Sequence, residues 1–295
     1  MKMILFRKTV SPEKINSSMQ RGIQALIALQ QPDGSFPLYQ RKGRKSWDEC
    51  HALFSTVSVL LAVAPLLPYD VVSKAVKYIL ACRRSDGTWE FDPALGIPAD
   101  ADDTACALAV IARHDTSLVS ASDTRILRSF WRPDKGPFRT WQADSIWAIR
   151  ERDDAVVNCN VIHAIKETGG NPTTQEIEAV IRLIQSSTDG CRYYCSPETI
   201  GYAAIRAGYA FESLPEKITK KPKTREGILP MAQWLSITRQ RDDDIVSRII
   251  SAQTKDGSWP SERWFTAIGN PTPVWGSPAI STALCIEALH CSIRE

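Results

Sequence analysis

Apolar residues recur at helical spacing from the start of the chain. In the first such segment, Ser11-Pro12 provides a helix cap and first turn, and apolar residues follow at 15, 19, 23, 26, 27 and 29. Further amphipathic segments are expected over residues 69–83, 124–131, 174–187 and 242–253. Few segments alternate with period two, and strand-like runs are absent. The pattern therefore predicts an all-α protein.

Each of these segments ends in a similar turn, in which a glycine is followed by an aromatic residue two residues later, or three residues later at Gly190. The turns contain Gly34, Gly87, Gly136, Gly190 and Gly257, at steps of 53, 49, 54 and 67 residues. Glycine permits the positive φ that ends a helix, and the aromatic side chain then covers the helix end. Such a period indicates an internal repeat of helical units.

A second, more apolar helix is expected after each turn. These inner helices are predicted over residues 48–63, 102–114, 155–168, 197–208 and 277–292, and a degenerate pair over 226–239 keeps Gln233-Trp234 without the glycine turn. Paired outer and inner helices form either an open solenoid or a closed ring. The small repeat number and the apolar inner helices favour closure. We expect one (α/α)6-type barrel domain spanning residues 1–295.

Three carboxylates are crowded at the start of one inner helix, in Pro98-Ala-Asp100-Ala-Asp102-Asp103-Thr104. One aspartate is enough to cap a helix. Like charges so close together make one carboxyl hold its proton to higher pH, and such a group is a candidate general acid. An over-capped surface helix and a site for a divalent cation are the two other interpretations.

Composition indicates an ordinary globular protein, with 295 residues, 43% hydrophobic and 23% charged. A net charge of +3 is too small to indicate a nucleic-acid partner. The eight cysteines form no Cys-x-x-Cys pair, so no zinc framework is visible. Cys191 and Cys195 could form a disulfide or bind a metal, or they are free thiols in a reducing compartment.

The N-terminal ten residues contain only a four-residue apolar run, which is too short for a signal peptide. The longest apolar stretch, residues 54–67, includes polar residues and is shorter than a membrane span. We therefore expect a soluble cytoplasmic protein. Peripheral contact between a surface of the barrel and a membrane stays open.

The turns over residues 30–36 and 253–259 resemble the Gln-Trp repeat of squalene–hopene cyclases, related terpene cyclases and protein prenyltransferase β chains. The stretch Asp100-Ala-Asp102-Asp103-Thr104-Ala105 is similar to the Asp-x-Asp-Asp-Thr-Ala motif of class II terpene cyclases. The resemblance implies an α/α barrel in which the middle aspartate, here Asp102, protonates an isoprenoid C=C bond or epoxide. Asp100 and Asp103 would support it.

An alkene is a very weak base, so such an acid must be held undissociated in a dry pocket. The resemblance implies no cofactor for the protonation itself, although Mg²⁺ could accompany a diphosphate substrate.

A second patch, residues 153–164, is similar to a helix of related diterpene cyclases in which an asparagine holds the catalytic aspartate. By position Asn160 is the better match and Asn158 the next, with His163 on the same helical face as Asn160. The alternative interpretation is that the two asparagines are a buried polar pair whose side chains hydrogen-bond to the backbone.

A carbocation needs an apolar chamber with aromatic faces. The candidate lining residues are Trp47, Phe54, Trp141, Tyr194, Tyr202 and Trp275. Two basic stretches lie in expected loops, residues 217–225 and the group Arg41, Lys42, Arg44 and Lys45. They are either solvated loops or, in the case of the latter group, a clamp for a substrate diphosphate.

Well-studied class II cyclases place the active site between two barrels, whereas this chain is long enough for one. A single barrel would enclose a smaller chamber for a C15 to C20 isoprenoid, unless a homodimer or a second barrel subunit supplies a wall. The leading hypothesis is protonation-initiated cyclisation of a linear isoprenoid diphosphate or related polyene.

The alternatives are a non-catalytic isoprenoid-binding scaffold that partners another cyclase-type chain, or a prenyltransferase subunit. A prenyltransferase would need zinc, and Asp48, Cys50 and His51 are instead expected to begin an inner helix. The metal motif of ionisation-driven cyclases is missing, because Asp242-Asp243-Asp244 precedes an expected surface helix.

Overall fold

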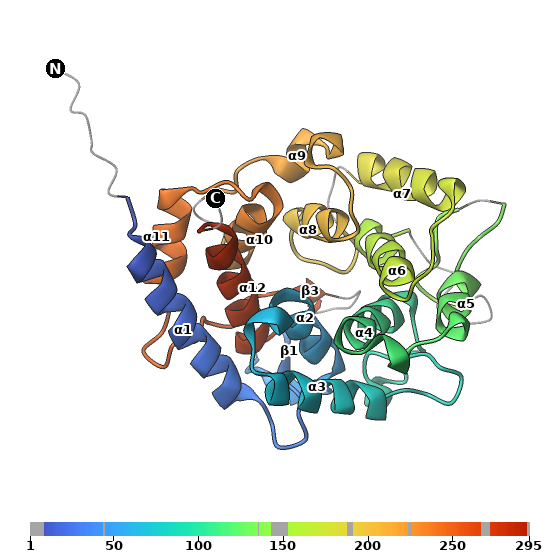
Figure 1. The fold of residues 1–295 in the computed structure, drawn as a ribbon, viewed down its shortest axis with the longest axis horizontal. Helices are drawn as coiled ribbons and strands as arrows, with labels where there is room; N and C mark the ends of the chain where they lie inside the picture. The colour runs from blue at the N-terminus through green and yellow to red at the C-terminus, as the bar shows by residue number, and fades with distance from the viewer. Residues whose placement is uncertain are drawn as a thin grey trace.

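The computed structural model describes residues 9–43, 45–134, 136–142, 153–187, 191–223, 226–266 and 272–293. Within them, six inner helices form a ring in which each contacts the next and the last contacts the first (Figure 1). They are α2 (Leu53–Val63), α4 (Ala101–His114), α6 (Ala155–Glu167), α8 (Glu198–Arg206), α10 (Ile228–Thr238) and α12 (Pro278–Cys291). The predicted closed α/α barrel is confirmed.

Six outer helices surround this ring (Figure 1). They are α1 (Pro12–Leu29), α3 (Tyr69–Ala81), α5 (Ala121–Ser129), α7 (Thr174–Ser186), α9 (Glu216–Thr219) and α11 (Asp243–Ser251). The helix α9 has only four residues, which explains why its repeat looks degenerate in the sequence. The described connections contain the 3-10 turns η1 (Ala64–Leu66), η2 (Pro93–Leu95), η3 (Thr116–Leu118) and η5 (Phe211–Ser213).

The glutamine of the repeat ties each turn to the neighbouring outer helix. Gln30 Nε2 donates to the carbonyl of Gly34 at 3.0 Å and to that of Val71, on α3, at 2.8 Å. Gln253 Nε2 donates to the carbonyl of Gly257 at 2.8 Å and to that of Ser18, on α1, also at 2.8 Å. The second of these contacts joins the last repeat to the first and so closes the outer layer.

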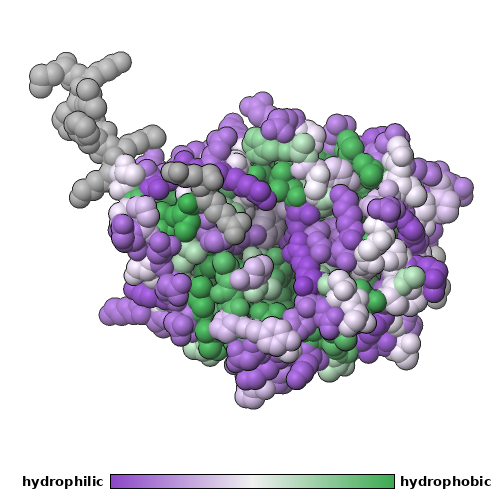
Figure 2. All heavy atoms as spheres, viewed as in Figure 1, coloured by the Kyte–Doolittle hydropathy of each residue, from purple (hydrophilic) through white to green (hydrophobic). Residues whose placement is uncertain are grey.

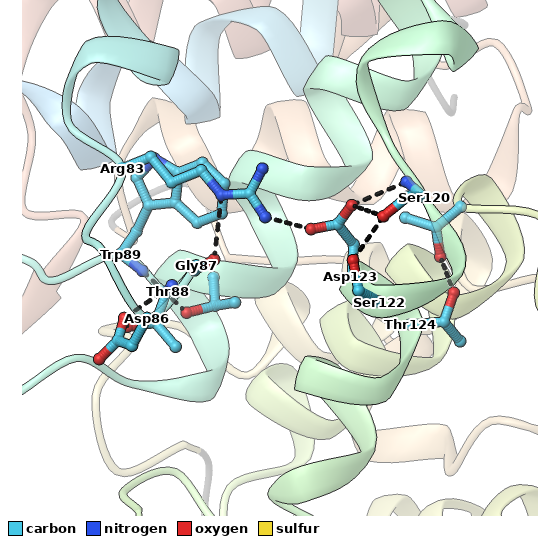
Figure 3. A network of polar contacts seen from close by, with 11 residues as sticks. Arg83, Asp86, Gly87, Thr88, Trp89, Ser120, Ser122, Asp123 and Thr124 are labelled. Atoms are coloured by element: carbon cyan, nitrogen blue, oxygen red, sulfur yellow. Dashed lines mark hydrogen bonds and ion pairs between the residues drawn. The ribbon is translucent and has the colours of Figure 1, made fainter.

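An arginine takes the place of the glutamine in the second repeat. Arg83, four residues before Gly87, donates from Nε to the Gly87 carbonyl at 3.4 Å and forms an ion pair with Asp123 on α5 (Figure 3). Asp123 Oδ2 also accepts the backbone N–H of Ser120 at 2.7 Å, which caps α5. The turn after α3 is thus linked to the next outer helix, as in the glutamine repeats.

The repeat glycines are required by conformation and by space. Gly34 has φ +96°, and a Cβ there would lie 2.4 Å from the carbonyl oxygen of Lys74 on α3. Gly257 has φ +90°, and its Cβ would lie 2.5 Å from the carbonyl oxygen of Arg21 on α1. The predicted positive φ is therefore confirmed at both positions, whereas Gly190 lies outside the described residues.

The repeat aromatics are anchored to the first turns of the inner helices. In each case a polar side chain accepts the backbone N–H of the aromatic residue, at 2.8 to 3.1 Å. The pairs are Phe36 with Thr56, Trp89 with Thr104, Phe138 with Asn158, and Trp259 with Thr282. Thr104 of the acidic motif and Asn158 therefore hold the repeat turns.

Substitution of Trp259 measures how much these anchored aromatic residues stabilise the barrel. Its ring is 1% exposed, and its Nε1 donates to the carbonyl of Ile249 at 2.6 Å. Trp259→Ala should lower the free energy of unfolding by about 3–5 kcal/mol, because it leaves a large cavity. Trp259→Phe should cost only about 1–2 kcal/mol. Urea denaturation measures both, and equal losses would contradict the packing argument.

The expectation of no strands is wrong. Four short strands form an antiparallel sheet in the order β2-β1-β4-β3, with β1 at Leu38–Lys42, β2 at Asp48–Cys50, β3 at Phe265–Thr266 and β4 at Pro273–Gly276. These runs of two to five residues are too short to show an alternating pattern. The inner helix expected from residue 48 begins at Leu53, since residues 48–50 pair with β1 instead.

In the part of the chain that the structure describes, no helix is both long and apolar enough to cross a bilayer. The cytoplasmic location stays a prediction. The extent of the single domain, 1–295, also stays a prediction.

Candidate active site

The acidic motif forms the cap and first turn of α4. Asp100 is the N-cap, and its Oδ1 accepts the backbone N–H of Asp103 at 2.8 Å. The Asp100 backbone also forms an antiparallel β-bridge with Trp141. All three aspartates are at most 8% exposed, so the over-capped surface helix is the wrong interpretation. Capping accounts for Asp100 and leaves two further buried carboxyls to be explained.

Asp102 is held by donors from two other parts of the barrel. Asn160, on α6, donates from Nδ2 to Oδ1 of Asp102 at 2.7 Å. Tyr194, between α7 and α8, donates from its hydroxyl to Oδ2 at 2.5 Å. Hydrogen bonds of this kind strengthen when the acceptor is ionised. The contact expected between Asn160 and Asp102 is present, while Tyr194 was expected only as a lining aromatic.

Burial raises the pKa of each carboxyl, because a low-dielectric environment disfavours charge. Burial, then the charge of Asp102, raises the pKa of Asp100 to about 7. Burial and the charges of Asp100 and Asp102 raise the pKa of Asp103 well above 3.8. Burial raises the pKa of Asp102 to about 6, against the hydrogen bonds from Tyr194 and Asn160 that lower it. All three carboxyls therefore keep their protons to higher pH than an exposed aspartate does.

The hydrogen-bond partners distinguish Asp102 from its neighbours. A general acid works best with a pKa close to the working pH, and both Asp100 and Asp102 meet this condition. Asp102 also has two side-chain donors placed to hydrogen-bond its ionised form. Asp103 has no such arrangement, since among the described residues its buried Oδ1 has no hydrogen-bond partner.

A cavity of about 640 Å³ lies beside the motif. This volume is within the roughly 300–1,000 Å³ of typical small-molecule sites. All three aspartates line it, together with residues of the sheet and of the segments around it. Its other apolar and aromatic walls are Phe54, Phe91, Leu95, Ile97, Trp141, Val157, Tyr193, Tyr194, Phe265, Pro273 and Trp275.

Aromatic rings gather on the sheet side of this cavity. Phe265 and Trp275, on neighbouring strands, stack with centroids 5.0 Å apart and an interplanar angle of 3°. Phe91 meets both rings edge-on, at 5.0 and 5.5 Å, and Phe54 lies 4.9 Å from Phe265. The faces of such rings attract cations. The ring faces of this cluster can therefore stabilise positive charge on the sheet side of the cavity.

Of the predicted lining residues, Phe54, Trp141, Tyr194 and Trp275 do line the cavity. Trp47 lies in a separate cleft, where Arg41 covers its ring at 4.7 Å. Tyr202 lines a second cavity, of about 20 Å³, that also contacts Asn160. These two residues are therefore not brought to the main cavity.

Asn158 and His163 are also absent from the cavity wall. Asn158 Nδ2 donates to the carbonyls of Phe138 and Asp154 at 3.1 and 2.9 Å. For Asn158, the interpretation as a buried residue whose side chain bonds to the backbone is therefore correct. His163 is buried on α6, and burial lowers its pKa to about 2. Its ring is neutral, with Nδ1 3.7 Å from Glu167 Oε1.

The basic residues are only partly where the diphosphate clamp requires them. Lys42 lines the cavity, whereas Arg41 lines the separate cleft with Trp47. Lys45 is exposed, and Arg44 lies outside the described residues. In the second basic stretch, Lys221 pairs with Asp242, the cap of α11. Among the described residues of this group, Lys42 is the one that lines the cavity.

Sequence reasoning missed Arg192, Tyr193, Phe91 and Phe265 as cavity residues. Tyr193 is the aromatic residue of the repeat turn at Gly190, and this position predicts a cover for a helix end and not a cavity wall. No pattern separates Arg192 from other loop residues. Phe91 comes two residues after the repeat aromatic Trp89, which is the one signal that could have identified it. Phe265 reaches the cavity through the unexpected strand β3.

In the described ranges, no group of three or more His, Cys, Asp or Glu side chains is arranged to hold a metal ion. The structure thus gives no support to a cation site at the acidic motif. Asp48 and Cys50 lie in β2, and His51 Nδ1 is 3.2 Å from the Phe91 carbonyl, so these residues do not begin an inner helix. All eight cysteines are free thiols, which contradicts a bridge between Cys191 and Cys195.

No model of a known protein family matches this sequence, and no curated protein matches it. The structure is similar to that of the type II terpene cyclase MstE from Scytonema, with a TM-score of 0.72 and 14% identity over 96% of this chain and 99% of that chain. The structure of MstE in complex with its substrate geranylgeranyl dihydroxybenzoate has a TM-score of 0.69 and 15% identity, over 95% of this chain and 97% of that chain.

A protein from Actinoplanes matches with a TM-score of 0.72 and 14% identity, over 95% of this chain and 100% of that chain. An unsaturated glucuronyl hydrolase specific for heparin matches less well, with a TM-score of 0.57 and 10% identity over 96% of this chain and 97% of that chain. The barrel architecture therefore occurs in proteins with different chemistry, and activity must be argued from the site. The chain has the fold of the type II terpene cyclase MstE.

Proposed function

We propose that this protein is a type II terpene cyclase that cyclises a linear C15 to C20 isoprenoid by protonation, with Asp102 as the general acid. One observation carries the proposal. Asp102 is a buried carboxyl with a raised pKa, it faces an aromatic cavity, and it has two hydrogen-bond donors in place for its ionised form.

The first step transfers the Asp102 proton to a terminal C=C bond. The O–H bond breaks, a C–H bond forms with the π electrons of the alkene, and a tertiary carbocation is left. Tyr194 and Asn160 stabilise the resulting carboxylate, because donors fixed in advance need no reorganisation during the reaction. A neighbouring C=C bond then attacks the cation and closes a ring. Loss of a proton from carbon to solvent gives a cyclic isomer of the substrate, and Asp102 takes up a proton from solvent before the next turnover.

The chamber keeps water away from the cation. The cluster of Phe54, Phe91, Phe265 and Trp275 offers ring faces without nucleophilic atoms. MstE matches this chain nearly from end to end, which supports activity of one barrel without a second. A homodimer or a partner subunit stays a prediction.

An anionic head group of the substrate would bind at Lys42 and Arg192. Both line the cavity, and the buried Arg192 Nε has no hydrogen-bond partner in the described part of the chain. Guanidinium and ammonium groups suit both a diphosphate and an aryl carboxylate. Protonation needs no cofactor in this proposal, and Mg²⁺ would act only as a counterion of a diphosphate.

Removing these charges should weaken substrate binding. Lys42→Met and Arg192→Met should each raise the dissociation constant for geranylgeranyl diphosphate by roughly 10-fold or more, because each removes a charge-assisted contact. Isothermal calorimetry measures this. Lys45→Met is the matched control, since Lys45 is exposed and does not line the cavity. Losses of the same size in all three variants would place the head group elsewhere.

The proposal as a whole is tested by incubating the purified protein with a panel of polyenes. The panel contains farnesyl and geranylgeranyl diphosphates, their free alcohols, squalene, and geranylgeranyl dihydroxybenzoate, which is the MstE substrate. Gas or liquid chromatography with mass spectrometry identifies a cyclic isomer. Tight binding of a polyene without any product would favour the non-catalytic scaffold.

A further inference from the structure

An arginine lies behind the pair formed by Asp102 and Asn160. Arg206, at the end of α8, donates from Nη2 to Oδ1 of Asn160 at 2.6 Å. Its guanidinium carbon lies 5.1 Å from the centre of the Tyr202 ring, and the Tyr202 hydroxyl donates to Oε2 of Glu287 at 2.6 Å. Side chains of α6, α8 and α12 therefore form a continuous polar chain that ends on Asp102.

The contact with Arg206 decides which way the Asn160 amide points. An asparagine side chain has a donor end and an acceptor end, and rotation by 180° exchanges them. Guanidinium groups only donate, so the amide oxygen must face Arg206. The amide NH₂ then faces Asp102 Oδ1, where it acts as a donor to the carboxylate. Without Arg206 the amide could present its oxygen to Asp102, which would repel the ionised form.

The charge of Arg206 acts on Asp102 as well. Burial raises the pKa of Asp102, whereas the hydrogen bonds from Tyr194 and Asn160 and the charge of Arg206 lower it. The other titratable groups near Asp102 are Asp100, Asp103 and Cys106 on its own helix, Asp154 at the start of α6, and Cys191 and Tyr194 between α7 and α8. In this set, Arg206 supplies the positive charge.

Arg206 is separated from the substrate cavity. It lines the small cavity of about 20 Å³ next to Asn160, and it is absent from the wall of the main one. Figure 2 shows a band of hydrophilic residues near the middle of the face in view, next to a patch of hydrophobic residues. A second arginine near this end of the barrel, Arg113, pairs with Glu167 at 3.2 Å.

We propose that Arg206 is a positioning residue for the proposed general acid, which fixes the donor end of the Asn160 amide on Asp102 and stabilises the carboxylate left after proton transfer. This inference rests on the proposed function for the role of Asp102 in turnover. Its structural part, the orientation of the amide and the effect of the charge, can be measured without turnover.

Three substitutions of Arg206 separate its effect on the orientation of the Asn160 amide from the effect of its charge. Arg206→Met removes both, Arg206→Gln keeps a donor for Asn160 without the charge, and Arg206→Lys keeps the charge. The protonation of Asp102 is followed by infrared difference spectroscopy of the carboxyl band, assigned by subtraction of the Asp102→Asn spectrum. The midpoint should rise by about one pH unit in Arg206→Met and by less in Arg206→Gln. It should return close to the wild-type value in Arg206→Lys.

Activity gives a second measurement. In Arg206→Met, kcat should fall about 10-fold with KM unchanged, and the alkaline limb of the pH profile should move to higher pH. Arg113→Met is the matched control and should leave the Asp102 midpoint and the profile unchanged. If Arg206→Met does not fold, the Gln and Lys variants decide, because the inference requires a higher midpoint in Gln than in Lys.

Equal midpoints in wild type, Arg206→Met and Arg206→Gln would overturn the inference even if the protein cyclises polyenes. Equal midpoints in the Gln and Lys variants alone would also overturn it. A shifted midpoint in a protein that cyclises nothing would instead overturn the proposed function and leave the effect of Arg206 on Asp102 in place.

Discussion

Replacement of Asp102 by asparagine should lower the rate of cyclisation by about 10⁴-fold, the upper end of what a general acid contributes. The amide has almost the same shape as the carboxyl but carries no acidic proton. Substrate affinity should change little, because Asp102 is not among the groups proposed to hold the head group. The rate is measured by product formation, and the affinity by calorimetry with the same substrate.

Asp103→Asn distinguishes Asp102 from its neighbour. The pKa of Asp103 is also raised, by burial and by the charges of Asp100 and Asp102, but its buried Oδ1 has no hydrogen-bond partner among the described residues. Its replacement should therefore reduce the rate much less than Asp102→Asn. A rate for Asp102→Asn within 10-fold of the wild type, or a larger loss in Asp103→Asn, would show that the proton comes from elsewhere.

Removal of the Tyr194 hydroxyl should have the second largest effect. Tyr194→Phe deletes the donor to Asp102 Oδ2, and losing one donor that stabilises developing charge costs roughly 10²–10³-fold in kcat. The phenyl ring remains in the cavity wall, so KM should stay within a few-fold of the wild-type value. Steady-state kinetics on the best substrate of the panel measures both constants.

The adjacent tyrosine is the matched control for this effect. Tyr193 also lines the cavity, but its hydroxyl accepts a hydrogen bond from Trp141 Nε1 at 3.3 Å and does not contact Asp102. Tyr193→Phe should keep kcat within about 10-fold, as expected for loss of a single weak neutral hydrogen bond. Equal losses in the two variants would mean that the hydroxyls act on packing or binding and not on Asp102.

The barrel could be predicted from the sequence because its signals are local and repeated. Gln30 and Gly34 lie four residues apart, and their contacts with α3 recur at Gln253 and Gly257 with α1. The sheet could not be predicted in the same way. Its strand β1 pairs with β4, more than 200 residues later, and each strand is too short to carry a pattern.

In the candidate site, the aspartates also have a local sequence signal, whereas the partners of Asp102 do not. The three aspartates are recognisable within four positions of sequence, whereas Tyr194 lies 92 residues from Asp102 in the chain. Helical periodicity alone does not choose between Asn158 and Asn160, which point about 200° apart, and Asn160 is preferred only by its position in the resemblance. One of them binds the repeat aromatic Phe138, and the other binds Asp102. Only the packing of α4 against α6 decides between them.

The central claim is that an enzyme proton begins the reaction, and isotope incorporation tests it most directly. The protein is equilibrated in D₂O, so that Asp102 carries deuterium, and is then given the polyene that it converts. The account predicts a cyclic product one mass unit heavier than the substrate, with the deuterium at the carbon that is protonated first. Asp102→Asn should give none of it. A cyclic product without deuterium, or one that forms equally well in Asp102→Asn, would contradict the account.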